Sequence, residues 1–297
     1  MRHLIFGLFA LWLACPVSAQ TVIDFRDELD FDDPEAWAMK FFTSASLQTS
    51  LGAIERLEPG AIELGLEAMQ IPHLDQEQRT VGFGGFKEED LNRAPAWGRL
   101  RVRFGLPHGF SATLGWVPPA EVNGLEANLL SLAIEKILLE RERWSLSLRG
   151  YTQVGETKGD LTCEEGGDER FPPGSPENPF GCLAPSSDEI TMEYTGLELV
   201  GAYKLAGPRA PTLHLGVAGN RLDMEFQVDA LVFNFRDRSL LLADGDTFSI
   251  TGGATWKLKR KIHLGVEAFY SPLSVQRLGQ AEEDDSLLHL RGQLRFR

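Results

Sequence analysis

Charged residues alternate with apolar ones in two segments of this sequence. Glu63 and Glu67 alternate with leucine, isoleucine and alanine, and Arg99, Arg101 and Arg103 alternate with leucine, valine and phenylalanine. Side chains of a β-strand point alternately to opposite faces, so the charges of each segment share one face. We therefore expect two strands that present opposite charges to one polar space.

The end of the chain adds Arg291 and Arg295 to this polar face, alternating with leucine and phenylalanine. If the strands close into a barrel, the last strand lies beside the first, and the glutamates then lie between two rows of arginines. Buried charges must be paired, which favours a filled lumen. The functional alternatives are a narrow path for anions or a binding site for an acidic or amphipathic small molecule. The predicted luminal charge cluster consists of Glu63, Glu67, Arg99, Arg101, Arg103, Arg291 and Arg295.

Two cysteines follow the N-terminal apolar segment, Cys163 and Cys182. An even pair in an exported chain predicts one disulfide, here within a long connection that is rich in proline and glycine. No cysteine and histidine residues have the spacing of a metal site, and the sequence indicates no cofactor.

Segments with a period of two predict ten strands, joined alternately by short and long connections. An even strand count with this alternation is typical of bacterial outer-membrane barrels, in which both chain ends and the short turns face the periplasm. We therefore predict an all-β, antiparallel up-and-down transmembrane β-barrel over residues 60–297. Its strands are expected at residues 60–71, 97–106, 110–118, 125–139, 144–156, 189–205, 211–228, 246–258, 262–274 and 286–297.

Aromatic residues on the apolar faces collect near strand ends, as in the two interfacial girdles of a membrane barrel. In the segment 211–228 the apolar residues change phase near Gly219 and Asn220, which predicts a β-bulge. The predicted lipid-interface aromatics are Phe110, Trp116, Trp144, Tyr203, Phe248, Trp256, Tyr270 and Phe296.

Residues 20–59 do not fit the barrel pattern. Asp33 followed by Pro34 resembles a helix start, and apolar residues follow at helical spacing, so we expect a short helix over about 34–51, inside the lumen or beneath it. The alternative makes Met39 to Leu51 a strand and, with help from residues 20–31, gives a barrel of twelve strands.

Residues 1–19 have the basic start, apolar stretch and small-residue end of a signal peptide. The formal net charge of −14 argues against nucleic acid as a partner. The acidic residues are concentrated in the predicted loops. Export together with amphipathic strands predicts a location in the cell outer membrane.

The chain from about residue 60 resembles bacterial outer-membrane β-barrel proteins in its strand pattern, girdles and loop asymmetry. Its terminal segment, Leu288 to Arg297, is similar to the assembly signal of this class. The resemblance implies outer-membrane lipids, lipopolysaccharide and the barrel-assembly machinery as partners. A segment before the barrel is also similar to hydrophobic-compound transporters with a luminal hatch, but no residue motif of that family is matched.

Enzyme chemistry has little support in the sequence. The His-x-Ser motif of lipid-A acyl hydrolases is absent, and only His73, His289, Asp284 and Asp285 could meet at the outer rim. We expect a structural or surface-interaction barrel with a filled lumen. The alternatives are a passive transporter of small amphipathic or anionic molecules and, with less support, an outer-membrane hydrolase. The oligomeric state is not indicated.

Overall fold

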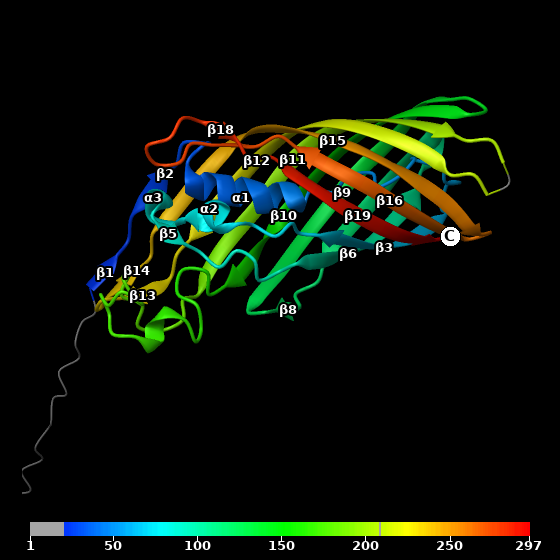
Figure 1. The fold of residues 1–297 in the computed structure, drawn as a ribbon. Coiled ribbons are helices and arrows are strands. Elements are labelled where there is room, and N and C mark those ends of the chain that lie inside the picture. Colours follow the sequence, from blue (N-terminus) through cyan, green and yellow to red (C-terminus); the bar gives the residue numbers. More distant parts are fainter. Residues whose placement is uncertain (1–20, 208) are drawn as a thin grey trace, which may run out of the picture.

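The computed structural model of the protein describes residues 21–207 and 209–297, and the predicted signal peptide lies outside them. Antiparallel strands form a closed barrel, because each pairs with its neighbour and the pairing of β10 with β9 completes the circle (Figure 1). The prediction of a ten-stranded all-β barrel is confirmed. Its strands are β3 (Ile62–Gln70), β6 (Ala96–Gly105), β7 (Phe110–Val117), β9 (Leu125–Glu140), β10 (Trp144–Gly159), β11 (Asp188–Lys204), β12 (Thr212–Gln227), β15 (Leu240–Lys259), β16 (Ile262–Ser271) and β19 (Leu287–Phe296).

Alternation of residue type builds this wall. In β3, Leu64 and Leu66 lie on the outside and are about half exposed, whereas Glu63 and Glu67 are buried on the inside. The same alternation runs around the barrel and gives a continuous apolar outer face. The wall thus has the two faces that the period of two predicts.

The remaining elements are small. β1 and β2 pair in parallel with β14 and β15, outside the circular order. No helix in the described part of the chain is both long and apolar enough to cross a membrane. The helices and strands outside the barrel wall are α1 (Pro34–Ala45), α2 (Gln76–Arg79), α3 (Gly82–Gly85), η1 (Pro107–Gly109), η2 (Asp168–Arg170), β1 (Thr21–Ile23), β2 (Arg26–Glu28), β4 (Thr80–Val81), β5 (Lys87–Glu88), β8 (Glu121–Val122), β13 (Ala230–Val232), β14 (Phe235–Asp237), β17 (Ser274–Val275) and β18 (Glu283–Asp284).

The helix α1 lies inside the barrel, near the end that carries the long loops (Figure 1). It begins after Asp33, with Pro34 in its first turn, and its side chains Trp37 and Phe41 are buried. The helix ends at Ala45, six residues earlier than predicted. The twelve-strand alternative is wrong, because residues Met39 to Leu51 add no strand to the wall.

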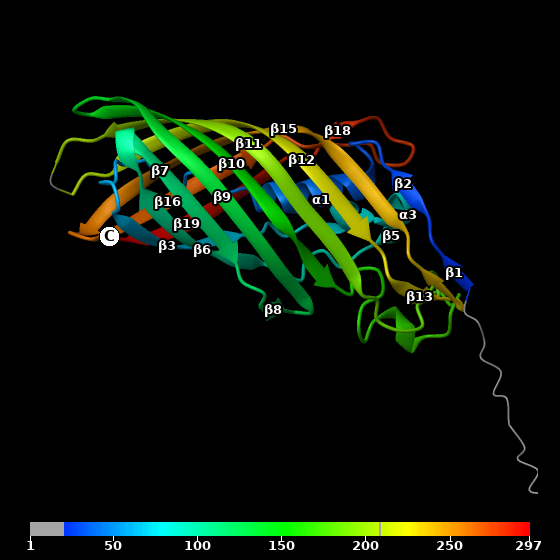
Figure 2. The same cartoon turned by 180° about the vertical axis from the view of Figure 1, so that it is seen from behind.

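Residues 46–57 continue from α1 as an extended segment down the lumen to the short-turn end, where Gly60 donates to the carbonyl of Gly105 (2.9 Å). This path corrects the expectation that both chain ends lie at the short-turn end. The C-terminus does lie there, but β1 lies beside the long loops at the opposite end (Figures 1 and 2). The N-terminal segment crosses the lumen once. For this reason β1 lies at the long-loop end, although the segment reaches the first barrel strand, β3, at the short-turn end.

The bulge predicted in β12 is also wrong. Its register with β11 and β15 is unbroken, and Leu222 and Met224 point inward with no exposed surface. The outward positions beside them are Arg221 and Asp223. The apolar phase changes because the surroundings change along one regular strand: the outside becomes polar, and the inside packs on α1.

Candidate functional site

The structure places every residue of the predicted luminal charge cluster on the inner face of the wall, and each is at most 7% exposed. β3 carries the glutamates between the arginines of β6 and β19 because it pairs with both strands. We use the name charged layer for this cluster together with the inward residues Glu135, Arg149, Glu198 and Glu267.

Glu67 lies at the centre of the charged layer. It faces Arg99 in the strand register, but the shorter contact is diagonal: Arg101 donates from Nε to its Oε2 at 2.7 Å, and Arg99 Nη1 lies 3.7 Å away. Glu67 and Arg99 have no exposed surface. Removing the carboxylate would leave two guanidinium groups without their shared anion.

Glu63 is surrounded by three arginines nearer the short-turn end. Arg103 and Arg295 each lie 3.7 Å from its Oε1, and Arg297 donates to its Oε2. The arginines of β6 and β19 therefore converge on the glutamates of β3, as complementary signs on adjacent strands require.

A second set of pairs extends the layer around the wall, through the neighbouring strands β9, β10 and β11. Arg103 donates to Glu135 at 2.8 Å, and Arg149 lies between Glu135 (3.1 Å) and Glu198 (3.2 Å). Glu267 accepts from Thr49 of the N-terminal segment at 2.7 Å. Arg149 faces Glu135 and Glu198 directly in the registers of its two neighbouring strands, whereas Arg103 reaches Glu135 across β7.

The arginines also bind backbone carbonyl groups of the N-terminal segment, a contact that the residue pattern does not predict. Arg291 donates to Leu47 (2.5 Å) and Ala45 (3.1 Å), and Arg99 donates to Ser46 (2.5 Å). Further along the segment the same contact recurs: Arg149 donates to Gln48, Arg101 to Thr49 (2.8 Å) and Arg103 to Glu55 (2.8 Å).

These contacts explain why α1 ends where it does. The last carbonyls of a helix lack partners within it and carry a partial negative charge. Here Arg291 and Arg99 supply both the donors and the positive charge at that end. We call α1 and residues 46–57 the plug, because guanidinium groups of the wall hold its backbone in the lumen.

Little free space remains in the charged layer. A cavity bounded by Glu63, Arg101, Arg103, Glu135 and Arg295 measures about 20 Å³, which is room for about one water molecule. Above this cavity, that is, toward the long-loop end, the apolar side chains of α1 pack against Leu222, Met224 and Phe269. We call this upper part the apolar layer.

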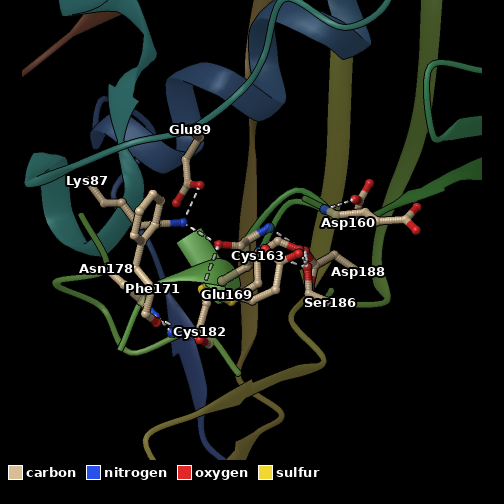
Figure 3. The surroundings of a disulfide bond; sticks show 12 residues. Lys87, Glu89, Asp160, Cys163, Glu169, Phe171, Asn178, Cys182, Ser186 and Asp188 are labelled. Atoms are coloured by element: carbon tan, nitrogen blue, oxygen red, sulfur yellow. Dashed lines mark hydrogen bonds and ion pairs between the residues drawn. A yellow bond between two sulfur atoms is a disulfide. The ribbon is translucent and has the colours of Figure 1, made fainter. Parts of the chain in front are cut away.

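The disulfide between Cys163 and Cys182 is present, with 19 residues of sequence separation (Figure 3). Around it, the Asn178 amide joins the carbonyls of Phe171 and Cys182, and Ser186 accepts from the Cys163 amide. The long connection 160–187 is therefore folded through polar contacts and one covalent bond.

Lys87 and Glu89 join this loop to the connection that follows β3 (Figure 3). Lys87 donates to Glu89 at 2.6 Å and to the carbonyl of Thr162. Burial raises the pKa of the Glu89 carboxyl to about 7, although the Lys87 ammonium partly lowers this pKa. This contact therefore titrates near neutral pH.

The residues considered for rim catalysis do not assemble into a site. His289 is buried, with Nδ1 2.8 Å from the carbonyl of Gln70 and Nε2 accepting from Arg291 at 3.0 Å. Asp285 instead accepts from Arg277 (2.7 Å), and His73 and Asp284 are exposed. Across the described ranges, no group of three or more histidine, cysteine or acidic residues is arranged to hold a metal.

The predicted interface aromatics all lie on the outer face of the wall. Near the short turns, Trp144 faces Tyr203 across β10 and β11, and Phe296 faces Ile262. Trp116, on β7, lies nearer the long loops and faces Leu100. Trp256 is partly buried, and the others are between 39% and 53% exposed.

Comparison with known proteins adds little beyond the fold. No known protein family matches the sequence, and no curated protein does. Among solved structures, the chain is similar to the outer-membrane protease OmpT from Escherichia coli, at 12% identity and a TM-score of 0.36 over 80% of this chain and 91% of that one. It is also similar to the Ralstonia pickettii toluene transporter TbuX, at 9% identity and a TM-score of 0.33 over 78% and 70%. At such values neither likeness carries an argument about activity or cargo.

Proposed function

We propose that this chain is an outer-membrane barrel with a closed lumen and a structural or surface-interaction role. The observation that carries the proposal is the plug, which Arg291, Arg99, Arg149, Arg101 and Arg103 hold by its backbone. A conducting barrel needs a continuous aqueous path, and the charged layer holds a cavity of only about 20 Å³.

The outer face supports the location in the membrane. Leucine, isoleucine and valine side chains such as Leu66, Leu215 and Val217 are about half exposed and form a continuous band. In water such a band would favour aggregation, whereas in a bilayer it faces hydrocarbon. We propose that residues 1–19 direct export, and that the assembly machinery, outer-membrane lipids and lipopolysaccharide are the partners.

The long-loop end supports a role at the surface. The disulfide loop 163–182 and the strand pair β13–β14 come together there, since Cys182 bridges to Val232. A plugged barrel that anchors ordered loops would present a fixed surface to other molecules. No substrate or transported molecule is needed for that role.

Conductance in a planar bilayer tests the proposal. The purified protein should first migrate faster on unboiled than on boiled gels, which shows a folded barrel. It should then give no steady conductance. Steady, anion-selective conductance by the wild-type protein would contradict the closed lumen and favour passive transport of small anions. Equal migration in both gels, with solubility in plain buffer, would contradict the membrane barrel itself.

A further inference from the structure

The barrel wall has an interruption beside β7. This strand pairs with β6 up to Trp116 and with β9 up to Val117, where β7 ends. Both neighbours extend further toward the long loops, because β6 begins at Ala96 and β9 begins at Leu125. Above Val117 the wall is completed by residues 118–120 and by β8, which pairs with β9 alone (Figure 2). The interruption lies near the long-loop end, at the level of the interface residue Trp116.

A cavity of about 330 Å³ occupies this interruption. Its lining includes Leu66 and Leu100, which face outward and are about half exposed, and Phe42 and Met192, which belong to the interior. The cavity therefore extends from the outer face through the wall to the side of the plug. Its volume is at the lower end of the range of small-molecule sites, about 300–1,000 Å³.

The lining is almost entirely apolar. Arg99 lines it too, but its Nη2 donates to Ser46 and Gln153, and its charge is paired with Glu67, which lies 3.7 Å from its Nη1. The cavity thus offers no free charge to a charged ligand, and an ionised headgroup inside it would lie unpaired at a cost.

Among the uncharged side chains of the lining, two polar atoms have no hydrogen-bond partner within the described residues. They are the indole Nε1 of Trp97 and the hydroxyl Oγ1 of Thr157, and both are buried. A buried donor without an acceptor is unfavourable, and a ligand that carries one neutral acceptor would satisfy it.

We propose that this wall pocket binds the acyl chain of a membrane lipid from the leaflet on the long-loop side. The chain enters through the interruption beside β7, passing over Leu66 and Leu100. Its hydrocarbon lies against Phe42 and Met192, and its headgroup stays outside. An ester carbonyl near the mouth is the kind of acceptor that Trp97 or Thr157 can use. The inference rests on the proposed membrane location and goes beyond the structural role.

Quenching of Trp97 fluorescence by bromine tests this inference. In a variant with Trp116, Trp144 and Trp256 replaced by phenylalanine, the described tryptophans that remain are Trp97, in the pocket, and Trp37, which has no exposed surface. The protein is placed in nanodiscs of phosphatidylcholine with or without bromine on the acyl chain. A second arm adds 12-bromododecanol to unbrominated discs. The gel-mobility test confirms folding before each measurement.

Brominated phosphatidylcholine should quench Trp97, and Ala127→Phe, which fills the pocket, should abolish most of this quenching. The matched control Ala268→Phe, on the outer face of β16, should leave it unchanged.

Folded protein that incorporates into nanodiscs but shows no Trp97 quenching would overturn the pocket and leave the proposed function intact. Quenching that Ala127→Phe does not reduce would also overturn it, since the bromine would then act from the general lipid surface. Quenching by 12-bromododecanol alone would replace the lipid by a free alkyl compound. Failure to enter nanodiscs would reject the membrane location and the pocket together.

Discussion

The charged layer and the apolar layer fill the same barrel by different physical means. In the charged layer, wall arginines bind glutamates and also the plug backbone, so each contact depends on direction and partner. In the apolar layer, Trp37 and Phe41 of α1 pack against Leu222 and Met224 without hydrogen bonds between these side chains. The charged layer fixes the position of the plug, and the apolar layer excludes water from the lumen toward the long-loop end.

This difference predicts how each layer responds to the substitution of a side chain. Removing one member of a buried ion network leaves its partners charged and unpaired, which costs more than the lost contact. Removing a buried apolar side chain leaves a cavity that neighbours partly fill. We therefore expect mutations in the charged layer to have larger and more strongly coupled effects.

The largest effect is expected for Glu67→Ala. The change leaves Arg99 and Arg101 without their shared carboxylate and should lower the free energy of unfolding by about 3–5 kcal/mol. Urea titration in lipid vesicles, followed by gel mobility, measures it. The exposed loop acid Glu282 provides the matched control, and Glu282→Ala should change the unfolding energy by less than about 0.5 kcal/mol.

Coupling within the charged layer gives a second measurement on the same residues. Arg101→Ala in the Glu67→Ala background should recover part of the lost stability, because contacting sites are not additive. Independent, additive losses would show that the two groups do not interact in the folded barrel. A mild Glu67→Ala phenotype would indicate that water solvates the arginines.

In the apolar layer, Leu222→Ala should lower the free energy of unfolding by about 3 kcal/mol, since the side chain is fully buried against α1. Leu215, on the same strand, is 60% exposed on the outer face, and Leu215→Ala should cost less than half as much. The same urea titration compares the two variants. A larger loss at Leu215 would mean that the plug does not pack in the upper lumen.

The disulfide is expected to matter for its loop alone. The pair Cys163→Ser and Cys182→Ser removes a closure that constrains about twenty residues, worth up to roughly 3 kcal/mol to the ordered loop. Limited proteolysis should cut within 163–182 faster in this variant, while the urea midpoint of the barrel stays the same. A barrel that fails to fold would show that the loop takes part in assembly.

The smallest effect concerns pH. Because burial raises the folded-state pKa of Glu89 to about 7, its contribution to loop stability is fully present below about pH 4.5 and is lost as pH rises through about 7. Hydrogen exchange in the loop, corrected for intrinsic rates, should therefore increase from pH 5 to pH 8. Glu89→Gln should reduce this increase, whereas Glu88→Gln should leave it unchanged.

An increase of the same size in Glu89→Gln would assign the pH dependence to another group. Glu88 is a suitable control because it lies in the same connection and contacts Arg79 (2.6 Å) with a partly exposed side chain.

The period of two was sufficient to predict the wall from the sequence. The strand predicted at 262–274, for example, is Ile262–Ser271, because inward and outward residues differ in polarity wherever one face meets lipid. β12 shows where this signal fails. Leu222 and Met224 continue the inward face, but the sequence does not reveal that α1 makes the upper lumen apolar. The predicted bulge was therefore wrong.

The candidate site is likewise predictable from the sequence only in part. The signs and inward faces of Glu63, Glu67 and the arginines follow from alternation. The contacts of Arg291 with Leu47 and Ala45 do not, since a backbone carbonyl has no sequence signature. The wall pocket was not predicted either, because it arises from the difference in length between β7 and its neighbours.

The most direct test that the plug lies inside the lumen is a cross-link between the plug and the wall. A Cβ built on Gly52 would lie 3.9 Å from that of Thr255 on β15, within the range of disulfides. Gly52 has φ 129°, so cysteine there is strained, and the measured quantity is cross-link yield rather than stability. Thr255 points inward, and its neighbour Ala254 points outward.

In a chain lacking residues 1–19 and both native cysteines, Gly52→Cys with Thr255→Cys should cross-link on mild oxidation of the folded barrel, as detected by mass spectrometry. Gly52→Cys with Ala254→Cys should not. A folded barrel in which the Thr255 pair stays reduced, or in which both pairs react equally, would contradict a plug held inside the lumen.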